Sequence, residues 1–249
     1  MKFFEVHSLN KSFGGLRAID DLSQIFEEGE MSSIIGPNGA GKTTFFNLLT
    51  GYLRPDSGKI IFKDQDISKL PHYKIGRLGI NRSFQISHVF PSLTAFENVR
   101  ASVLSRQKRT FKFFTNVNDM KDIEQETMRV LEDIHLKDMA GIPADQLPHG
   151  ALKSLDIGMA LAMEPQIALL DEPTAGMASG DRMKIMDLIQ RLWEKKGLTI
   201  VFVEHDMDIV FSFSQKIRVL NYGSLIADGT PEEVSQDPDV IEAYLGEED

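Results

Sequence analysis

The spacing of apolar residues along this chain of 249 residues predicts two kinds of element. Residues 3–35 alternate short apolar runs with turns, and the last run, MSSIIG, enters a glycine-rich loop. Such runs are typical of β-strands. From about residue 95 to 150, apolar residues recur three and four positions apart, as in DIEQETMRVLEDIHL, which predicts helices. We therefore expect an α/β core that begins with strands and carries an inserted helical segment.

Two continuous apolar runs, QIALLDE and LTIVFVEH, follow the helical segment and have a helical stretch between them. The order strand, helix, strand predicts parallel pairing through a right-handed crossover. The tail, RVLNYGSLIADGTPEEV, predicts a hairpin that turns at Tyr222 and Gly223. It also predicts a helix capped by Thr230, with Pro231 at its first position.

Composition narrows the class of protein. Hydrophobic residues make up 42% of the chain, which is enough to fill a sizeable core. The formal charge of -10 argues against a general nucleic-acid binder. The chain has no cysteine, which excludes disulfides, zinc–thiolate sites and cysteine nucleophiles and makes the cytoplasm the default compartment. No apolar run approaches the ~18 residues of a bilayer span, so we expect any membrane link to run through a partner.

The stretch GPNGAGKTT matches the phosphate-loop pattern G-x-x-x-x-G-K-[ST] and lies between an apolar strand and an apolar helix, the context that this motif requires. Its glycines let backbone N–H groups turn toward phosphate oxygens, and the start of the helix adds a positive dipole end. Lys42 supplies a charge to the β- and γ-phosphates, and the Thr43 hydroxyl suits Mg²⁺. The predicted nucleotide-binding residues are Gly36, Pro37, Asn38, Gly39, Ala40, Gly41, Lys42, Thr43 and Thr44.

A nucleoside triphosphate with magnesium also needs a carboxylate at the end of a neighbouring strand, and IALLDE supplies two. Asp171 is the predicted metal partner, directly or through water. Glu172 is the predicted group that polarises the attacking water. An acidic pair at a strand end is more often a turn or a helix cap, so the catalytic interpretation depends on the phosphate loop.

These residues, in this order, resemble the nucleotide-binding subunit of ATP-binding cassette (ABC) transporters over nearly the whole chain. The resemblance implies ATP and Mg²⁺ as ligands. It also implies an α/β fold of the phosphate-loop NTPase type, with a RecA-like core sheet, an N-terminal antiparallel β-subdomain and an inserted helical subdomain. The single ABC ATPase domain spans 1–249, with the core at 1–94 and 156–249 and the helical subdomain, including the signature helix, at 95–155.

The resemblance assigns three further residues. Gln85, in NRSFQIS, matches the glutamine that reaches the metal and the attacking water, and His205, in VFVEHD, matches the histidine that contacts the γ-phosphate. Phe13, in KSFGG, occupies the place of the aromatic residue under the adenine ring, although an aromatic residue at the end of an early strand can equally be a core residue. The implied catalytic residues are Glu172, His205, Gln85 and Lys42, and the implied metal ligands are Thr43, Gln85 and Asp171.

The segment LPHGALKSL resembles the family's signature, whose start meets the γ-phosphate of ATP held by the opposite subunit. In the usual L-S-G-G-Q pattern only Leu147 and Gly150 fit, because Pro148 replaces the serine, His149 the first glycine and Ala151 the glutamine. Pro148 has neither a hydroxyl nor an N–H to donate. The helix dipole, the N–H groups around Gly150 and the His149 ring remain for an anion.

Ala178 is a second departure, in the loop that faces the other subunit and usually ends in aspartate or asparagine. Both departures lie on the surface expected to face a partner, whereas the residues of the chain's own phosphate site are intact. We hypothesise that this chain hydrolyses ATP in its own phosphate loop, completed by the signature of a different ATP-binding subunit. The alternative is a branch-specific variant that works normally in a homodimer.

Three stretches are similar to subunits that energise importers of branched-chain and other hydrophobic amino acids. They are the end of the chain, GTPEEVSQDPDVIEAYLGEED, together with INRSFQISHVFPSLTAFENV and the EPTAG run. This similarity implies integral membrane permease subunits, a second ATP-binding subunit and, indirectly, a periplasmic or extracellular substrate-binding protein. It places the chain on the cytoplasmic face of the inner (cell) membrane as a peripheral subunit. Urea or amide import and lipopolysaccharide export are alternatives. A soluble ABC ATPase without a transport role and an ATP sensor that does not hydrolyse are alternatives of another class.

The family resemblance further implies a groove between core and helical subdomain where a short permease helix docks. Ile86, Val89, Phe90 and Phe96 are the apolar residues near Gln85 that suit this docking, unless they pack the subdomain itself. The basic and aromatic stretch SRQKRTFKFF is expected to form an exposed helical edge beside lipid headgroups rather than a nucleic-acid site.

Overall fold

The structure is a computed structural model that describes residues 3–83, 89–107 and 117–245. Its strands are β1 (Phe4–Phe13), β2 (Leu16–Phe26), β3 (Met31–Ile35), β4 (Ser57–Phe62), β5 (Gln65–Asp66), β6 (Ile80–Ser83), β7 (Ile167–Asp171), β8 (Thr199–Val203), β9 (Lys216–Asn221) and β10 (Ser224–Gly229). Its α-helices are α1 (Lys42–Leu49), α2 (His72–Arg77), α3 (Ala95–Arg106), α4 (Val117–Asp133), α5 (His149–Ala162), α6 (Ser179–Lys196), α7 (Met207–Phe213), α8 (Pro231–Ser235) and α9 (Pro238–Leu245), and short 3₁₀ helices span Lys137–Met139 and Ala144–Gln146.

The N-terminal strands form an antiparallel sheet in the order β2-β1-β4-β5. Phe4 of β1 pairs with Phe26 of β2 on one side and with Phe62 of β4 on the other. The Phe4 ring lies 5.6 Å from the Phe26 ring and 5.9 Å from the Phe62 ring, measured between centroids. These aromatic pairs fix the register of the sheet, because a slip of one residue would turn them to the solvent face.

The main sheet has the order β10-β9-β3-β8-β7-β6, and its pairs are parallel except for β10 with β9. Every residue of β3, β7 and β8 is buried, since helices cover both faces of this sheet. The parallel pairing predicted for QIALLDE and LTIVFVEH is confirmed, with α6 as the crossover. The ends of β3, β7 and β8 therefore meet at one edge of the sheet, which is where the functional residues lie.

The predictions for the tail are also confirmed. Tyr222 and Gly223 connect β9 to β10 in an antiparallel hairpin. Thr230 caps α8, with its hydroxyl accepting a hydrogen bond from the Glu233 amide and the Glu233 carboxylate accepting one from the Thr230 amide. Pro231 is the first residue of the helix. This capping box satisfies backbone N–H groups that a helix start otherwise leaves unpaired.

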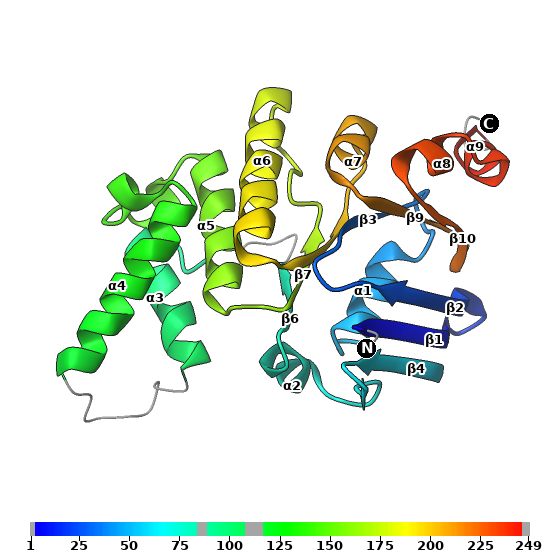
Figure 1. The fold of residues 1–249 in the computed structure, drawn as a ribbon, viewed down its shortest axis with the longest axis horizontal. Coiled ribbons are helices and arrows are strands. Elements are labelled where there is room, and N and C mark those ends of the chain that lie inside the picture. Colours follow the sequence, from blue (N-terminus) through cyan, green and yellow to red (C-terminus); the bar gives the residue numbers. More distant parts are fainter. Residues whose placement is uncertain (1–2, 84–88, 108–116, 246–249) are drawn as a thin grey trace.

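Helices α3, α4 and α5 form the inserted helical part, at the end of the molecule opposite β1 and β2 (Figure 1). Their apolar faces share one buried cluster that includes Val99, Leu131 and Leu155. Helix α5 continues to Ala162, so the boundary predicted at residue 155 falls inside this helix. The reason is that its apolar spacing continues past that residue and packs the helix against both the helical part and the core.

A buried ion-pair group joins the antiparallel sheet to the main sheet. Arg218 of β9 is 1% exposed, and its guanidinium bonds to the Glu30 carboxylate at 2.6 Å and to the Ile25 carbonyl oxygen at 3.0 Å. The Asp228 carboxylate lies 3.6 Å from its Nε, and the guanidinium lies 4.4 Å from the centre of the Phe26 ring. The Arg218 side chain thus connects β9 and β10 of the main sheet to β2 of the antiparallel sheet and to the turn that contains Glu30.

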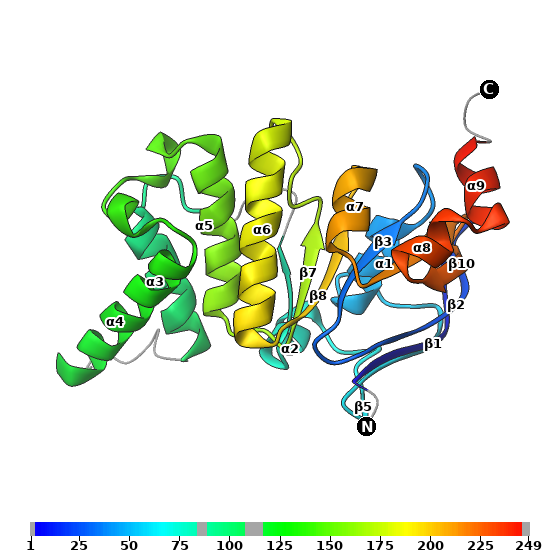
Figure 2. The same ribbon diagram turned by 45° about the horizontal axis from the view of Figure 1, so that its top comes forward.

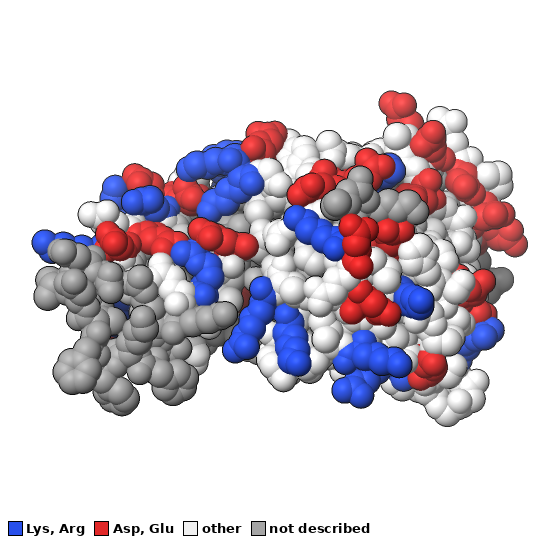
Figure 3. All heavy atoms as spheres, turned by 60° about the horizontal axis from the view of Figure 1, so that its bottom comes forward, with Lys and Arg blue, Asp and Glu red and all other residues white. Residues whose placement is uncertain are grey.

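The surface carries charges of both signs. On the face shown in Figure 3, Lys and Arg side chains are interspersed with Asp and Glu side chains. Within the described ranges, no helix is both long enough and apolar enough to cross a bilayer.

Candidate active site

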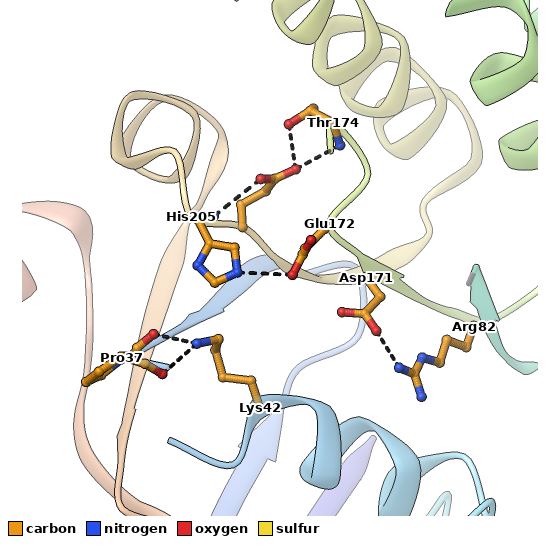
Figure 4. Close-up of polar contacts among 9 residues, drawn as sticks. Pro37, Lys42, Arg82, Asp171, Glu172, Thr174 and His205 are labelled. Atoms are coloured by element: carbon orange, nitrogen blue, oxygen red, sulfur yellow. Dashed lines mark hydrogen bonds and ion pairs between the residues drawn. The ribbon is translucent and has the colours of Figure 1, made fainter. Parts of the chain in front are cut away.

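The phosphate loop leaves β3 and enters α1 at Lys42. The Lys42 amine is buried and donates hydrogen bonds to the carbonyl oxygens of Gly36 and Pro37, at 2.9 Å for Pro37 (Figure 4). Its positive charge therefore lies inside the curve of the loop, where phosphate oxygens can replace the carbonyl groups. Of the other loop residues, Ala40 is buried, Asn38, Gly39 and Thr43 are exposed, and Gly41 and Thr44 are half-buried.

Two glycines let the loop pass close to neighbouring backbone. Gly36 has a φ of 149°, and a Cβ atom added there would lie 2.0 Å from the carbonyl oxygen of Leu220. Gly41 has a φ of 102°, and its added Cβ atom would lie 2.5 Å from the carbonyl oxygen of Ala18. Because both contacts are with backbone atoms, no rotation of a neighbouring side chain can make room for a larger residue.

We expect Gly36→Ala to weaken ATP binding by about fivefold to a hundredfold, because a loop distortion of about 1–3 kcal/mol falls on the groups that hold the phosphates. Titration with a fluorescent ATP analogue measures this. Gly180→Ala, at the start of α6, is the matched control, since a Cβ atom there meets nothing within 4 Å. Equal affinities of Gly36→Ala and the unmodified chain would contradict the prediction.

The two acidic residues lie at the end of β7. Glu172 follows directly on Asp171 and has a φ of 47°, a left-handed conformation that residues other than glycine rarely adopt. Its amide donates a hydrogen bond to the Val203 carbonyl oxygen at 2.9 Å, which extends the pairing of β7 with β8. Its Oε1 lies 3.0 Å from Nε2 of His205 (Figure 4). The fold thus brings together two predicted catalytic residues that are 33 positions apart.

Arg82 is a residue at this site that sequence reasoning missed. Its guanidinium forms a salt bridge with the Asp171 carboxylate, and both side chains are 6% exposed. The same guanidinium bonds to Asn47 of α1 and lies 5.6 Å from the centre of the Phe46 ring. The sequence signal for Arg82 was its position as a charged residue within a short strand of a buried sheet, because a buried charge requires a partner.

Glu204 and Thr174 were missed as well. Glu204 follows β8, is 5% exposed, and accepts hydrogen bonds from Thr174 in the turn after Glu172 (Figure 4). The signal was an acidic residue that comes directly after the apolar run VFV and before the predicted His205.

A family model described as "ABC transporter" matches residues 19–175, which is more than half of the chain. The chain belongs to the ABC transporter family. A second model, described as "Branched-chain amino acid ATP-binding cassette transporter", matches residues 224–249 of the cassette.

The cassette is similar to the high-affinity branched-chain amino acid transport ATP-binding protein BraF of Pseudomonas aeruginosa, with 38% identity over 248 residues, or 98% of this chain and 97% of BraF. A solved nucleotide-free ATP-binding cassette from an ABC transporter matches with a TM-score of 0.85 and 29% identity, covering 99% of this chain and all of that one. A dimeric bacterial ABC transporter cassette matches with a TM-score of 0.77 and 26% identity, covering 92% of this chain and 99% of that one. The predicted family and fold are confirmed.

The helix predicted to carry the signature, α5, has Pro148 as its N-cap residue and His149 as its first residue. The Pro148 carbonyl oxygen accepts a hydrogen bond from the Leu152 amide at 2.9 Å, but no side chain caps the helix. A Cβ atom added to Gly176 would lie 3.8 Å from the exposed His149 ring, so this helix start lies beside the loop that follows β7. In Figures 1 and 2, α6 lies between α5 and α1. Helix α5 and the helix that follows the phosphate loop therefore lie on opposite sides of α6 in both views.

Phe13 lies at the end of β1 with 46% of its surface exposed, so it is not a core residue. The Lys11 amine lies 5.6 Å from the centre of the ring. The β1–β2 hairpin approaches the phosphate loop through the contact of Ala18 with Gly41. Stacking of Phe13 on adenine stays a prediction. Gln85 lies outside the described residues.

The four apolar residues predicted to dock a permease helix differ in their surroundings. Val89 and Phe96 are half-buried and pack against the core cluster shared by the helical part, which favours the packing alternative for these two. Phe90 is 53% exposed, and its amide and carbonyl groups bond to the buried Asn98 side chain at 2.8 and 3.1 Å. Ile86 lies outside the described residues. Phe90 is therefore the described candidate that the cassette presents to solvent.

A cavity of about 790 Å³ lies between the core and the helical part of the cassette. Its aromatic and basic lining residues are Tyr52, His72, Tyr73, Arg77, Arg82 and Arg106. The Tyr52 and His72 rings stack with their centroids 4.8 Å apart. Burial raises the pKa of Tyr52, against the opposite effect of the Arg82 guanidinium, so its phenol is neutral at physiological pH. Of the residues predicted to dock a permease helix, the described ones, Val89, Phe90 and Phe96, do not line this cavity.

Proposed function

We propose that this chain is the ATP-hydrolysing subunit of a membrane transporter that imports branched-chain or other hydrophobic amino acids. The observation that carries the ATPase activity is the contact of Glu172 with His205 at 3.0 Å, beside the buried Lys42. The name of BraF and the match of residues 224–249 to a branched-chain amino acid cassette model support the substrate class.

In the proposed reaction, the phosphates of ATP occupy the curve of the phosphate loop. Backbone N–H groups and the start of α1 neutralise their charge, and Lys42 turns from the loop carbonyl groups to the β- and γ-phosphate oxygens. Glu172 accepts a proton from the water that attacks the γ-phosphorus, while His205 donates a hydrogen bond to the γ-phosphate. The bond from the γ-phosphorus to the β–γ bridging oxygen breaks, and ADP and inorganic phosphate leave.

The residues at the end of β7 and the start of α1 fit a magnesium ion. One oxygen of the buried Asp171 carboxylate is paired with Arg82, and the other is directed toward the space beside Lys42 (Figure 4). The exposed Thr43 hydroxyl supplies a second oxygen donor. Mg²⁺ takes oxygen ligands and is usually shared between one or two protein groups and substrate phosphates. When bound, it neutralises charge that develops on the phosphate oxygens.

The proposed partners are integral membrane permease subunits, a second ATP-binding subunit and, indirectly, a substrate-binding protein outside the membrane. The cassette then lies on the cytoplasmic face of the inner (cell) membrane. BraF, named a transport ATP-binding protein, supports the link to a permease, and the similarity to a dimeric cassette supports pairing of two ATP-binding subunits. Phe90, which is 53% exposed, is the proposed contact for a permease helix.

The second ATP-binding subunit is proposed to be a different chain with a more complete signature. The start of α5 offers no side-chain cap and no serine hydroxyl, and Ala178 at the N-cap of α6 offers no capping oxygen either. This surface therefore provides fewer donors for a nucleotide on a partner than the family pattern does. The cassette's own loop, with Lys42 buried in it, retains the groups needed to bind and hydrolyse ATP.

Restoring the signature tests this asymmetry. We expect the double change Pro148→Ser and His149→Gly to raise ATP turnover of the assembled transporter, by about fivefold for one added hydrogen bond of about 1 kcal/mol. Phosphate release measures the turnover. Glu194→Gln is the control, because it changes an exposed residue near the end of α6 and adds no donor at the start of α5 or α6. Unchanged or lower turnover in the double variant would favour a homodimer that works with its own signature.

The proposed function is tested by purifying the complex that a tagged full-length chain retains and inserting it into lipid vesicles. With ATP, magnesium, a binding protein and radiolabelled leucine, we expect steady phosphate release together with accumulation of leucine. Phosphate release with transport of urea or an amide instead would shift the substrate class. Phosphate release without a co-purified membrane protein would indicate a soluble ATPase, and ATP binding without phosphate release would indicate an ATP sensor.

A further inference from the structure

The side chain of Glu204 connects the two segments that carry the proposed catalytic pair. Its Oε1 accepts hydrogen bonds from the Thr174 amide at 2.9 Å and from the Thr174 hydroxyl at 2.7 Å. Its Oε2 accepts a bond from the His205 amide at 3.3 Å. Glu204 is 5% exposed and Thr174 2%, so the two bonds between them are shielded from water. Figure 4 draws these bonds as dashed lines.

These hydrogen bonds between Glu204 and Thr174, the Glu204 bridge, restrain the backbone around Glu172 together with a bond on its other side. On the strand side, the Glu172 amide bonds to the Val203 carbonyl oxygen at 2.9 Å. On the loop side, two residues farther along, Thr174 bonds to Glu204. Glu172 holds a left-handed backbone conformation with a φ of 47°, which persists only where the surrounding structure enforces it. The two attachments supply that restraint and also fix the distance between Glu172 and His205.

A carboxylate suits this position for a specific reason. A buried carboxylate is unfavourable unless its oxygens accept hydrogen bonds. The two carboxylate oxygens of Glu204 accept bonds from two different segments. One is the loop that follows Glu172, and the other is the turn that begins at His205. An apolar residue of the same size would pack in this space but would leave the Thr174 and His205 amides without this acceptor.

A second, more exposed bridge joins the same segments. Arg182 of α6 donates from Nε to the Met177 carbonyl oxygen at 2.8 Å and pairs with the Asp206 carboxylate at 2.9 Å. Its side chain is 38% exposed, so this pair is expected to contribute less than the buried one. The loop after Glu172 and the turn of His205 are thus joined twice.

We propose that Glu204 is a positioning residue that holds Glu172 and His205 in the arrangement needed for hydrolysis, without touching ATP. The proposal rests on the proposed ATPase function. It predicts that loss of the Glu204 bridge lowers the rate of the chemical step and leaves the binding of ATP unchanged, because the phosphate loop makes no contact with this bridge in the bonds described.

The test compares four variants of the full chain in its purified complex. For Glu204→Ala we expect kcat to fall about tenfold to a hundredfold, as for other small displacements of reacting groups, with the KM and the Kd for ATP unchanged. Thr174→Val removes the hydroxyl bond alone and is expected to lower kcat about fivefold. Thr174→Ser keeps both donors and should restore kcat.

Asp66→Ala is the matched control. Asp66 lies far from the site in the antiparallel sheet, and its Oδ1 accepts bonds from the Ser68 amide at 2.9 Å and the Ser68 hydroxyl at 2.5 Å, as Glu204 does from Thr174. We expect this variant to lower the melting temperature and leave kcat unchanged. If Glu204→Ala fails to fold, the comparison of Thr174→Val with Thr174→Ser still decides the question.

The positioning role is overturned if Glu204→Ala or Thr174→Val keeps the kcat of the unmodified chain. It is also overturned if Asp66→Ala lowers kcat as much as they do, or if the loss appears in KM rather than in kcat. Absence of phosphate release from the unmodified complex is a different result, because it contradicts the proposed ATPase itself. The two failures are therefore distinguishable in one set of measurements.

Discussion

Glu172→Gln should abolish steady ATP hydrolysis while leaving ATP binding in place. Glutamine keeps the size of the side chain and can still bond to His205, but it is too weak a base to take a proton from the attacking water. General base catalysis contributes about a hundredfold to ten thousandfold, so we expect phosphate release to fall by at least about a hundredfold. The Kd for a fluorescent ATP analogue should stay unchanged, since Lys42 and the loop that bind the phosphates are not altered.

Glu194→Gln is the control, because it makes the same chemical change on the exposed surface of α6. Light scattering of Glu172→Gln with ATP and magnesium then reports on the partner. A doubled mass would show that Pro148 and His149 still hold the opposite γ-phosphate in a homodimer. A chain that binds ATP and stays monomeric would support a different second subunit. Phosphate release at the unmodified rate would remove Glu172 from the proposed mechanism.

Arg218→Met should destabilise the chain by about 3–5 kcal/mol, the range found when one partner of a buried ion pair is removed. Methionine fills part of the space, but it leaves the buried Glu30 carboxylate without the guanidinium that bonds to it at 2.6 Å. Because Arg218 also bonds to the Ile25 carbonyl oxygen, the attachment of the antiparallel sheet to the main sheet is weakened. Urea unfolding followed by circular dichroism measures the free energy.

Arg17→Met is the matched control. Arg17 pairs with Asp20 at 2.8 Å, but its side chain is 59% exposed, so we expect a loss below about 1 kcal/mol. Adding Glu30→Met to Arg218→Met should recover part of the stability, because the unpaired charge is removed as well. A loss below about 1 kcal/mol in Arg218→Met alone would mean that the buried pair does not hold the two sheets together.

The motifs that could be read from the sequence are those whose chemistry is local. The phosphate loop needs a strand, a turn of glycines and a helix in immediate succession, so its residues from Gly36 to Thr44 were predicted from one short stretch. The cap of α8 was predicted for the same reason, since Thr230 and Pro231 are adjacent in the sequence. The parallel strands were recognised because burial on both faces makes them continuously apolar.

The contacts that support these motifs were not predicted, because their partners are far apart in the sequence. Glu204 and Thr174 are 30 positions apart, Arg82 and Asp171 89, and Arg218 and Glu30 188. A single sequence shows that a charged residue interrupts an apolar strand, but it does not show which residue is its partner. The boundary predicted at residue 155 lies within α5, a helix that packs on both parts of the molecule.

The sequence by itself determined the family, the class of fold and the residues expected to bind phosphate, because these follow from the order and spacing of neighbouring residues. Only the tertiary structure decided that Glu172 lies 3.0 Å from His205, that Asp171 is paired with Arg82, and that the start of α5 lies beside the loop that follows β7. Distances between strand ends depend on how the whole sheet packs. That packing is set by many weak contacts spread over the chain, which no short stretch of sequence contains.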